Sequence, residues 1–213
     1  MKLININGAN ATGKSTRVTT LIKYLEENFK AELIYKNCKN GYKEIGRIYK
    51  DYFIMGRFNK KGVWVGLDLA DYSTLQSRLD LYKEISSEYP EVKYFVQEGY
   101  FNNASKNTTS DILKEYGVNS YHYYYIIYSD IEDYIDRCNG RTGLNRDLDW
   151  AKNSAGWKNN QNLYSIMDVY DKLNEPNGNT TKVDINAPKD YFVREFFDRT
   201  FEVPEIQPES DDW

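Results

Sequence analysis

The sequence is poor in the residues that build several kinds of catalytic and metal site. His122 is its only histidine, which excludes a histidine-based catalytic triad and any site with several histidine ligands. Cys38 and Cys138 are its only cysteines. They are far apart and outside any metal-ligand spacing, so we expect reduced thiols rather than a disulfide.

Long hydrophobic runs are also absent. No stretch approaches the roughly 20 apolar residues that span a bilayer, and we find no signal-peptide pattern before the first predicted strand. The 213 residues, 40% hydrophobic and 28% charged, predict a cytoplasmic protein without a membrane partner. We expect one domain over residues 1–203 and an acidic tail over residues 204–213.

The sequence does contain the pattern G-x-x-x-x-G-K-[ST], without a mismatch, near its beginning. The residues concerned are Gly8, Ala9, Asn10, Ala11, Thr12, Gly13, Lys14, Ser15 and the following Thr16. A strand is predicted before them, over residues 2–7, and an amphipathic helix after them. This order of strand, loop and helix predicts a cradle for nucleotide phosphates rather than a chance glycine turn.

Each part of this pattern has an expected role. Gly8 and Gly13 let successive backbone N–H groups turn toward an anion, beside the positive end of the helix. Lys14 is expected to reach the β- and γ-phosphates, and the Ser15 hydroxyl to bind Mg²⁺. ATP is the expected donor, although such a loop reads phosphates and does not distinguish ATP from GTP.

Strands and helices alternate along the rest of the chain. Strands are predicted near residues 31–35, 94–99, 121–128 and 181–185, and helices near 73–88, 131–138, 163–173 and 188–201. A short helix is expected over 41–50 and a hairpin over 51–67, with Ser73 as the cap of the following helix. This order predicts a three-layer α/β fold with a central parallel sheet, helices on both faces and an arginine-containing lid.

Two features point to phosphoryl transfer. Glu98 ends a strand that is expected to lie beside the first one, so its carboxylate is a candidate to bind Mg²⁺ through water. Arg137, Arg141 and Arg146 surround two glycines, and we expect residues 137–146 to form a flexible lid over the triphosphate. A surface loop with solvated arginines is the alternative.

The net charge of −4 conceals a basic segment. Residues 36–61 contain eight basic and two acidic residues, a net +6 that leaves −10 on the rest of the chain. Aromatic residues are interleaved with these charges, a pattern typical of proteins that follow a nucleic-acid backbone and stack on bases. A solvated face with its aromatic residues in the core explains the pattern equally well.

The expected site favours a small kinase among the proteins that share this fold. The chain has neither a guanine-reading Asn-Lys-x-Asp motif nor a Ser-Gly-Gly transporter signature, and it is short for a helicase. A kinase needs a carboxylate that accepts the proton of the acceptor hydroxyl. Asp68 is the first candidate, Glu98 the second and Asp71 a fallback, although Asp68 could equally be a capping carboxylate.

Several elements resemble known kinases. The glycine pattern, Gln97-Glu98-Gly99-Tyr100 and the segment from Tyr128 to Arg141 look like the nucleoside and nucleotide kinase superfamily, with thymidylate kinases as familiar members. Glu98-Gly99-Tyr100 replaces the Asp-Arg-Tyr triplet of thymidylate kinases, and their Arg-Glu-Pro motif is missing.

A closer resemblance is to the bacteriophage 5-hydroxymethyluracil DNA kinases, which phosphorylate a base hydroxymethyl group within DNA. Gly56-Arg57-Phe58, Gly66-Leu67-Asp68 and Glu98-Gly99 look like that group's Gly-Arg-Tyr, Gly-Cys-Asp and Glu-Gly elements, in the same order. The resemblance implies a kinase acting on DNA that contains a modified pyrimidine, with acceptor binding over residues 36–71. The expected acceptor-binding residues are Arg57, Phe58, Asp71 and Tyr100.

Three functions therefore stay open. The first is a DNA base-hydroxymethyl kinase, and the second is a kinase of free deoxynucleosides or deoxynucleoside monophosphates, which the acidic overall charge favours. The third is an inactive nucleotide-binding module that controls a partner. The intact Lys14 and Ser15, together with the arginine lid, argue against the third.

Overall fold

The computed structural model of the chain describes most of the residues that carry these predictions. It describes residues 1–9, 11–38, 41–59, 61–66, 72, 74–99, 115, 120–158, 160–162 and 178–200. The helix predicted over residues 163–173 and the tail over 204–213 lie outside these ranges.

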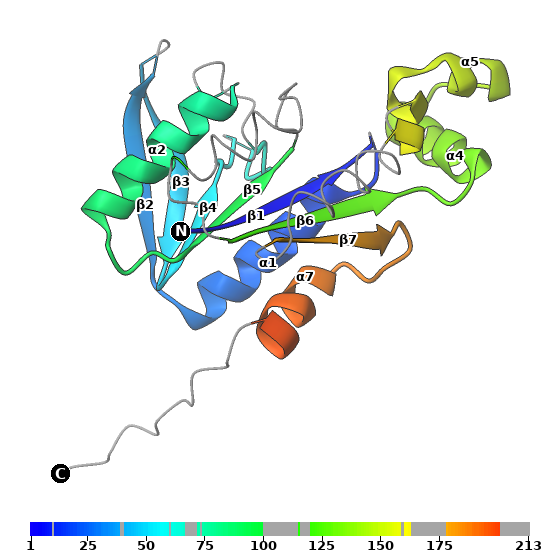
Figure 1. Cartoon of the computed structure of the whole chain (residues 1–213). Helices are drawn as coiled ribbons and strands as arrows, with labels where there is room; N and C mark the ends of the chain where they lie inside the picture. Colours follow the sequence, from blue (N-terminus) through cyan, green and yellow to red (C-terminus); the bar gives the residue numbers. More distant parts are fainter. Residues whose placement is uncertain are drawn as a thin grey trace.

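A seven-stranded sheet in the order β2-β3-β4-β5-β1-β6-β7 forms the middle of the molecule (Figure 1). Its strands are β1 (Lys2–Gly8), β2 (Ala31–Cys38), β3 (Gly41–Tyr49), β4 (Tyr52–Met55), β5 (Tyr94–Glu98), β6 (Ser120–Ile127) and β7 (Gly178–Asp184). β4, β5, β1, β6 and β7 pair in parallel, whereas β3 is antiparallel to both of its neighbours. The predicted parallel sheet is therefore confirmed, with two antiparallel pairings at one edge.

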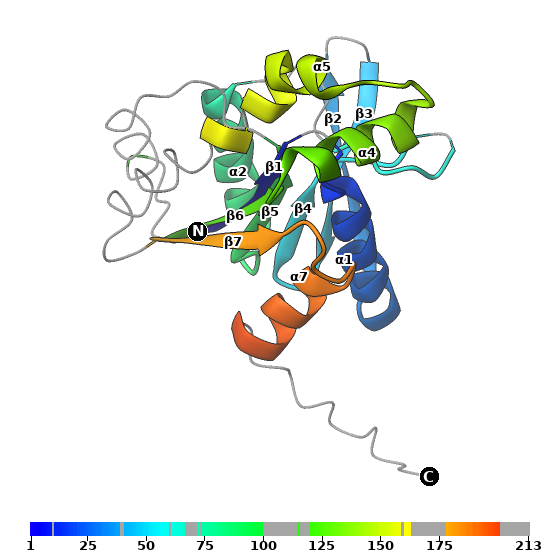
Figure 2. The ribbon, with the colours of Figure 1, turned by 90° about the vertical axis from the view of Figure 1, so that its right-hand side faces the viewer.

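Helices cover both faces of this sheet, as predicted. Figure 2 shows α1 (Lys14–Asn28) and α2 (Leu75–Glu88) on opposite sides, with α7 (Tyr191–Arg194) near α1. A π-helical segment, Glu195–Thr200, follows α7 directly. None of the helices among the described residues is long and apolar enough to cross a membrane.

Alternation along the strands supplies a separate core to each face. In β1, Leu3 packs in the core that includes α2, whereas Ile4 and Ile6 pack in the core that includes α1. β6 is covered on both faces in the same way, because Tyr125 belongs to the α2 core and Tyr124 to the α1 core. These two tyrosines are 1% exposed, so both belong to the core.

The helix predicted over residues 41–50 is wrong, because this segment is strand β3. Ile45 and Ile48 both pack in the α2 core, and their three-residue spacing looks helical. The spacing arises from a register shift against β2, where Ile34 pairs with Gly46 and Tyr35 with Glu44. Ile45 is the extra residue of this bulge, so a strand places both isoleucines on one face.

The boundaries of two other predicted elements also change. α2 is capped by Thr74, whose side chain accepts from the Ser77 backbone N–H, so the predicted cap Ser73 is one residue early. Of the hairpin predicted over residues 51–67, the first strand forms as β4, but it pairs with β3 and β5. The residues after it make a turn, in which Phe58 and Trp64 form an antiparallel bridge. We call this segment, described apart from Lys60, the 56–66 turn.

α4 (Ile131–Thr142) and α5 (Leu148–Asn153) lie beyond the ends of β6 and β7 (Figure 1). The flexible segment predicted from Arg137 onward is therefore partly wrong, because the helix continues through Gly140 to Thr142. Gly143, at φ 67°, ends it. Arg137 and Arg141 are consequently one helical turn apart on α4.

Candidate functional site

The loop over residues 8–16, here called the glycine loop, joins β1 to α1. Gly8 and Gly13 have positive φ values of 155° and 76°, and Ala11 has a φ of 60°. A Cβ at Gly8 would lie 2.5 Å from the Ile126 carbonyl oxygen, so only glycine fits there. The loop is thus a tight, partly left-handed turn of the kind that directs backbone N–H groups toward an anion. Asn10 lies outside the described residues.

The first turn of α1 is open to such an anion. Gly13 is its N-cap, and in the described part of the chain no side chain caps it. Arg17, 6% exposed, supports the glycine loop through hydrogen bonds to backbone carbonyls. Its guanidinium donates to the Thr12 carbonyl at 2.9 Å and to the Ile185 and Ala187 carbonyls at 2.8 and 2.6 Å.

Lys14 points back toward the loop. Its Nζ donates to the Gly8 and Ala9 carbonyl oxygens, at 2.8 Å each. Burial lowers the pKa of the Lys14 ammonium, while Glu98 raises it and Arg141 lowers it. A phosphate group beside Lys14 would favour the charged form and offset the cost of burial.

Glu98 lies at the end of β5, beside β1 as predicted. Its Oε1 accepts from Ser15 Oγ at 2.7 Å, and its Oε2 accepts from Trp64 Nε1 at 3.2 Å. Ser15 and Glu98 therefore form a pair of oxygen groups at the start of α1. Oxygen ligands of this kind suit Mg²⁺.

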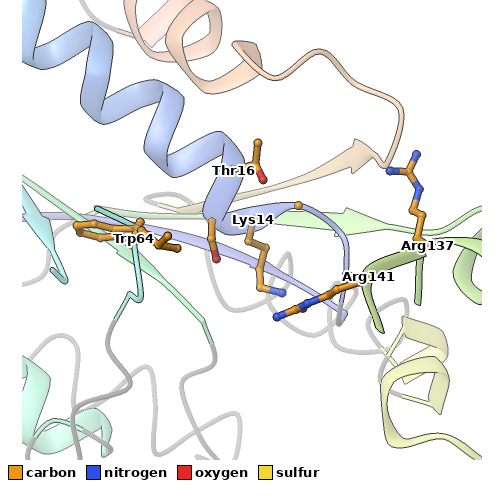
Figure 3. Close-up of a pocket in the computed structure, with 9 residues that line it drawn as sticks. Lys14, Thr16, Trp64, Arg137 and Arg141 are labelled. Atoms are coloured by element: carbon orange, nitrogen blue, oxygen red, sulfur yellow. The ribbon is translucent and has the colours of Figure 1, made fainter. Parts of the chain in front are cut away.

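A pocket of about 490 Å³ opens over the glycine loop (Figure 3). It is lined by Ala11, Gly13, Lys14, Ser15, Thr16, Val63, Trp64, Arg137 and Arg141. Figure 3 shows the Lys14 and Arg141 side chains pointing toward one another. Cations gathered around one opening favour an anionic ligand.

The three predicted lid arginines have different surroundings. Arg141 lines the pocket, and so does Arg137, which also donates to Asn186 Oδ1 at 2.8 Å. Arg146 is not among the lining residues. Its guanidinium lies 4.2 Å from the centre of the Trp150 ring, and its backbone N–H donates to Asn139 Oδ1.

Of the predicted acceptor-binding residues, Arg57 and Phe58 lie in the 56–66 turn. The Phe58 ring packs against Trp64, with centroids 5.3 Å apart, and the Arg47 guanidinium lies 4.6 Å from the centre of the Phe58 ring. Arg57 Nε is buried and has no hydrogen-bond partner within the part of the chain that the structure describes. The predicted residues Asp68, Asp71 and Tyr100 lie outside that part.

Two of the eight basic residues over residues 36–61, Lys36 and Arg47, form ion pairs. Lys36 contacts Glu84 and Glu88 of α2, at 2.7 and 3.1 Å. Arg47 contacts Glu26 and Glu44, at 2.7 and 2.6 Å. The segment is therefore less basic in the fold than in the sequence.

The aromatic residues of this segment, together with Tyr35 just before it, divide between core and surface. Tyr49 and Phe53 are fully buried, as the core interpretation predicts. Tyr35 and Tyr42 are 40% and 69% exposed, and their rings stack with centroids 5.5 Å apart. Among the aromatic residues that the structure describes in this stretch, only this pair is exposed.

Sequence reasoning missed three residues of the site, Arg17, Val63 and Trp64. Arg17 carries a weak signal, because it is a charged residue beside Val18 on the buried side of α1. Trp64 carries no signal, since its contact with Glu98 joins residues 34 positions apart.

A family model matches the chain over most of its length. The family model described as 5-hmdU DNA kinase 2 matches residues 1–170, which include the glycine loop, the 56–66 turn, Glu98 and the arginines of α4. No curated protein matches the chain in sequence.

Proposed function

The chain belongs to the 5-hmdU DNA kinase 2 family, and on this basis we propose that it transfers the γ-phosphate of ATP to the hydroxymethyl group of 5-hydroxymethyluracil within DNA. The observation that carries the proposal is the pocket that Lys14 and Ser15 share with Val63 and Trp64. A donor cradle and the turn expected to bind the acceptor therefore meet at one opening. The donor, the metal and the residue roles given below are parts of this proposal.

The donor half follows from the glycine loop. Its backbone N–H groups and Lys14 would hold the β- and γ-phosphates, and Arg137 and Arg141 would neutralise charge that develops on the transferred group. Ser15 and Glu98 fit Mg²⁺, because their oxygens are 2.7 Å apart beside the loop. When bound there, Mg²⁺ would supply positive charge to the phosphate oxygens.

The acceptor half supplies the nucleophile. The hydroxymethyl oxygen forms a bond to the γ-phosphorus as the bond from that phosphorus to the β–γ bridging oxygen breaks, and ADP leaves. The hydroxyl proton passes to a carboxylate, for which Asp68 is the first candidate and Glu98 the second. Arg57, Phe58, Asp71 and Tyr100 are the proposed contacts to the base or its flanking phosphates.

A kinase of free nucleosides or monophosphates is the second candidate. The ion pairs of Lys36 and Arg47 favour it, because they reduce the charge left for a DNA backbone. The exposed Tyr35 and Tyr42 pair favours the DNA substrate instead.

Labelled ATP separates these candidates. The protein is incubated with γ-labelled ATP and duplex DNA that contains 5-hydroxymethyluracil, and in parallel with thymine-containing DNA, free nucleosides and monophosphates. We expect label only in the modified DNA, and a loss of at least roughly 100-fold in Lys14→Ala, since Lys14 would stabilise the transferred phosphate. Label in free nucleotides but never in DNA would sink the proposal.

A further inference from the structure

Trp64 lies within the predicted hairpin and the predicted acceptor-binding range, but the sequence patterns assign it no role of its own, and it joins the two halves of the site. Its Nε1–H donates to one oxygen of Glu98, and Ser15 Oγ donates to the other. Glu98 is thus held from the 56–66 turn on one side and from the glycine loop on the other. Trp64 is 3% exposed, so water competes little for this hydrogen bond.

The 56–66 turn is built around the indole ring. A Cβ at Gly56, whose φ is 140°, would overlap the Trp64 ring. At Gly66, whose φ is 55°, a Cβ would lie 3.6 Å from Glu98 Oε2. These glycines begin two of the three elements that resemble the phage kinases. Gly56 leaves room for the Trp64 ring, whereas the 3.6 Å at Gly66 is an ordinary contact and its left-handed φ is what favours glycine there.

We propose that Trp64 is a positioning residue that fixes the Glu98 carboxylate for Mg²⁺ bound with the nucleotide. The inference rests on the proposed function, because it takes Glu98 as the metal-binding carboxylate. A donor that holds the second oxygen of such a carboxylate sets its orientation, and loss of a donor of this kind costs roughly 10- to 100-fold in metal affinity or activity. Because Arg57 and Phe58 lie in the same turn, Trp64 also ties the proposed acceptor contacts to the metal-binding group.

The test measures binding without turnover. Trp64→Phe keeps an aromatic ring against Gly56 but lacks the N–H donor. Trp157→Phe is the matched control, because Trp157 packs on Tyr134 and is not among the residues that line the pocket. Calorimetry with a non-hydrolysable ATP analogue at graded Mg²⁺ gives the Mg²⁺ concentration for half-maximal binding, and its stoichiometry reports the folded fraction.

We expect that concentration to rise about tenfold in Trp64→Phe and to stay unchanged in Trp157→Phe. In a Glu98→Ala background, Trp64→Phe should change it less than about twofold, because its partner is gone. If Trp64→Phe and Trp157→Phe show the same Mg²⁺ dependence, the inference about Trp64 is wrong, whereas the proposed function is unaffected. A wild-type protein without Mg²⁺-dependent nucleotide binding would overturn the proposed function as well.

Discussion

His122 lies in β6, away from the pocket, and its protonation links stability to pH. Its Nε2 is 3.0 Å from Thr181 Oγ1, and its ring stacks on Tyr124 with centroids 4.3 Å apart. Burial lowers the pKa of His122 to about 4 from its ordinary value of 6.5. Between these values the unfolded chain binds a proton that the folded protein does not, so the stabilising contribution is present above pH 6.5 and is lost as pH falls toward 4.

His122→Gln should remove this dependence. We expect the free energy of unfolding of the wild type to fall more steeply than that of the variant between pH 6.5 and 4, by at most about 1.4 kcal/mol per pH unit. Urea unfolding at four pH values measures the difference. Parallel curves for the two proteins would show that His122 titrates alike in both states.

At the scale of single residues, the sequence identified Lys14, Ser15 and Glu98 because a local pattern or the end of a strand marks each of them. The structure brings these three together, with Ser15 Oγ 2.7 Å from Glu98 Oε1. Trp64 could not be identified in this way. Its place depends on how the 56–66 turn lies against β5, which no local spacing encodes.

α4 is the element whose description changes most between sequence and structure. Gly140 lies inside this helix, and a Cβ there would meet nothing within 4 Å. Gly140→Ala should therefore stabilise the protein by roughly 0.5–1 kcal/mol, because glycine is a poor helix former. Thermal unfolding checks this, and an unchanged or lower Tm would favour the flexible segment that the sequence predicted.

In β3, by contrast, replacing a glycine with alanine should destabilise the protein. At Gly46 a Cβ would lie 2.5 Å from two atoms of the Phe53 ring and 2.8 Å from the Ile54 carbonyl oxygen. Gly46→Ala should therefore cost roughly 1–3 kcal/mol through overpacking. Urea unfolding gives the value, and a neutral substitution would contradict the pairing of β3 with β4.

The sequence predicts elements well where the hydrophobic period is regular and poorly where a bulge or a loop changes it. The strands predicted over residues 2–7 and 121–128 form as β1 and β6, in the interior of the sheet. In β3, the bulge at Ile45 gives isoleucines a helical spacing, so period alone predicts the wrong structure. The glycines around Arg141 suggested a loop, yet α4 continues through Gly140.

For the whole molecule, tertiary pairing decides what the charge pattern means. Within the +6 segment, Arg47 and Lys36 contact carboxylates of α1 and α2 respectively. Adding the formal charges of the segment cannot account for these ion pairs, because the partner carboxylates are 21 to 52 residues away in the sequence. Family membership, the pocket and the exposed Tyr35 and Tyr42 carry the argument for DNA instead.

The chemical position of the transferred phosphate tests the central claim most directly. DNA containing 5-hydroxymethyluracil is incubated with ATP, Mg²⁺ and the protein, digested to nucleosides and analysed by mass spectrometry, with Lys14→Ala as the control. We predict a phosphomonoester on the 5-hydroxymethyl oxygen with the wild type and none with Lys14→Ala. Unmodified 5-hydroxymethyl-2′-deoxyuridine after incubation with the wild type, while free nucleotides are phosphorylated, would contradict the account.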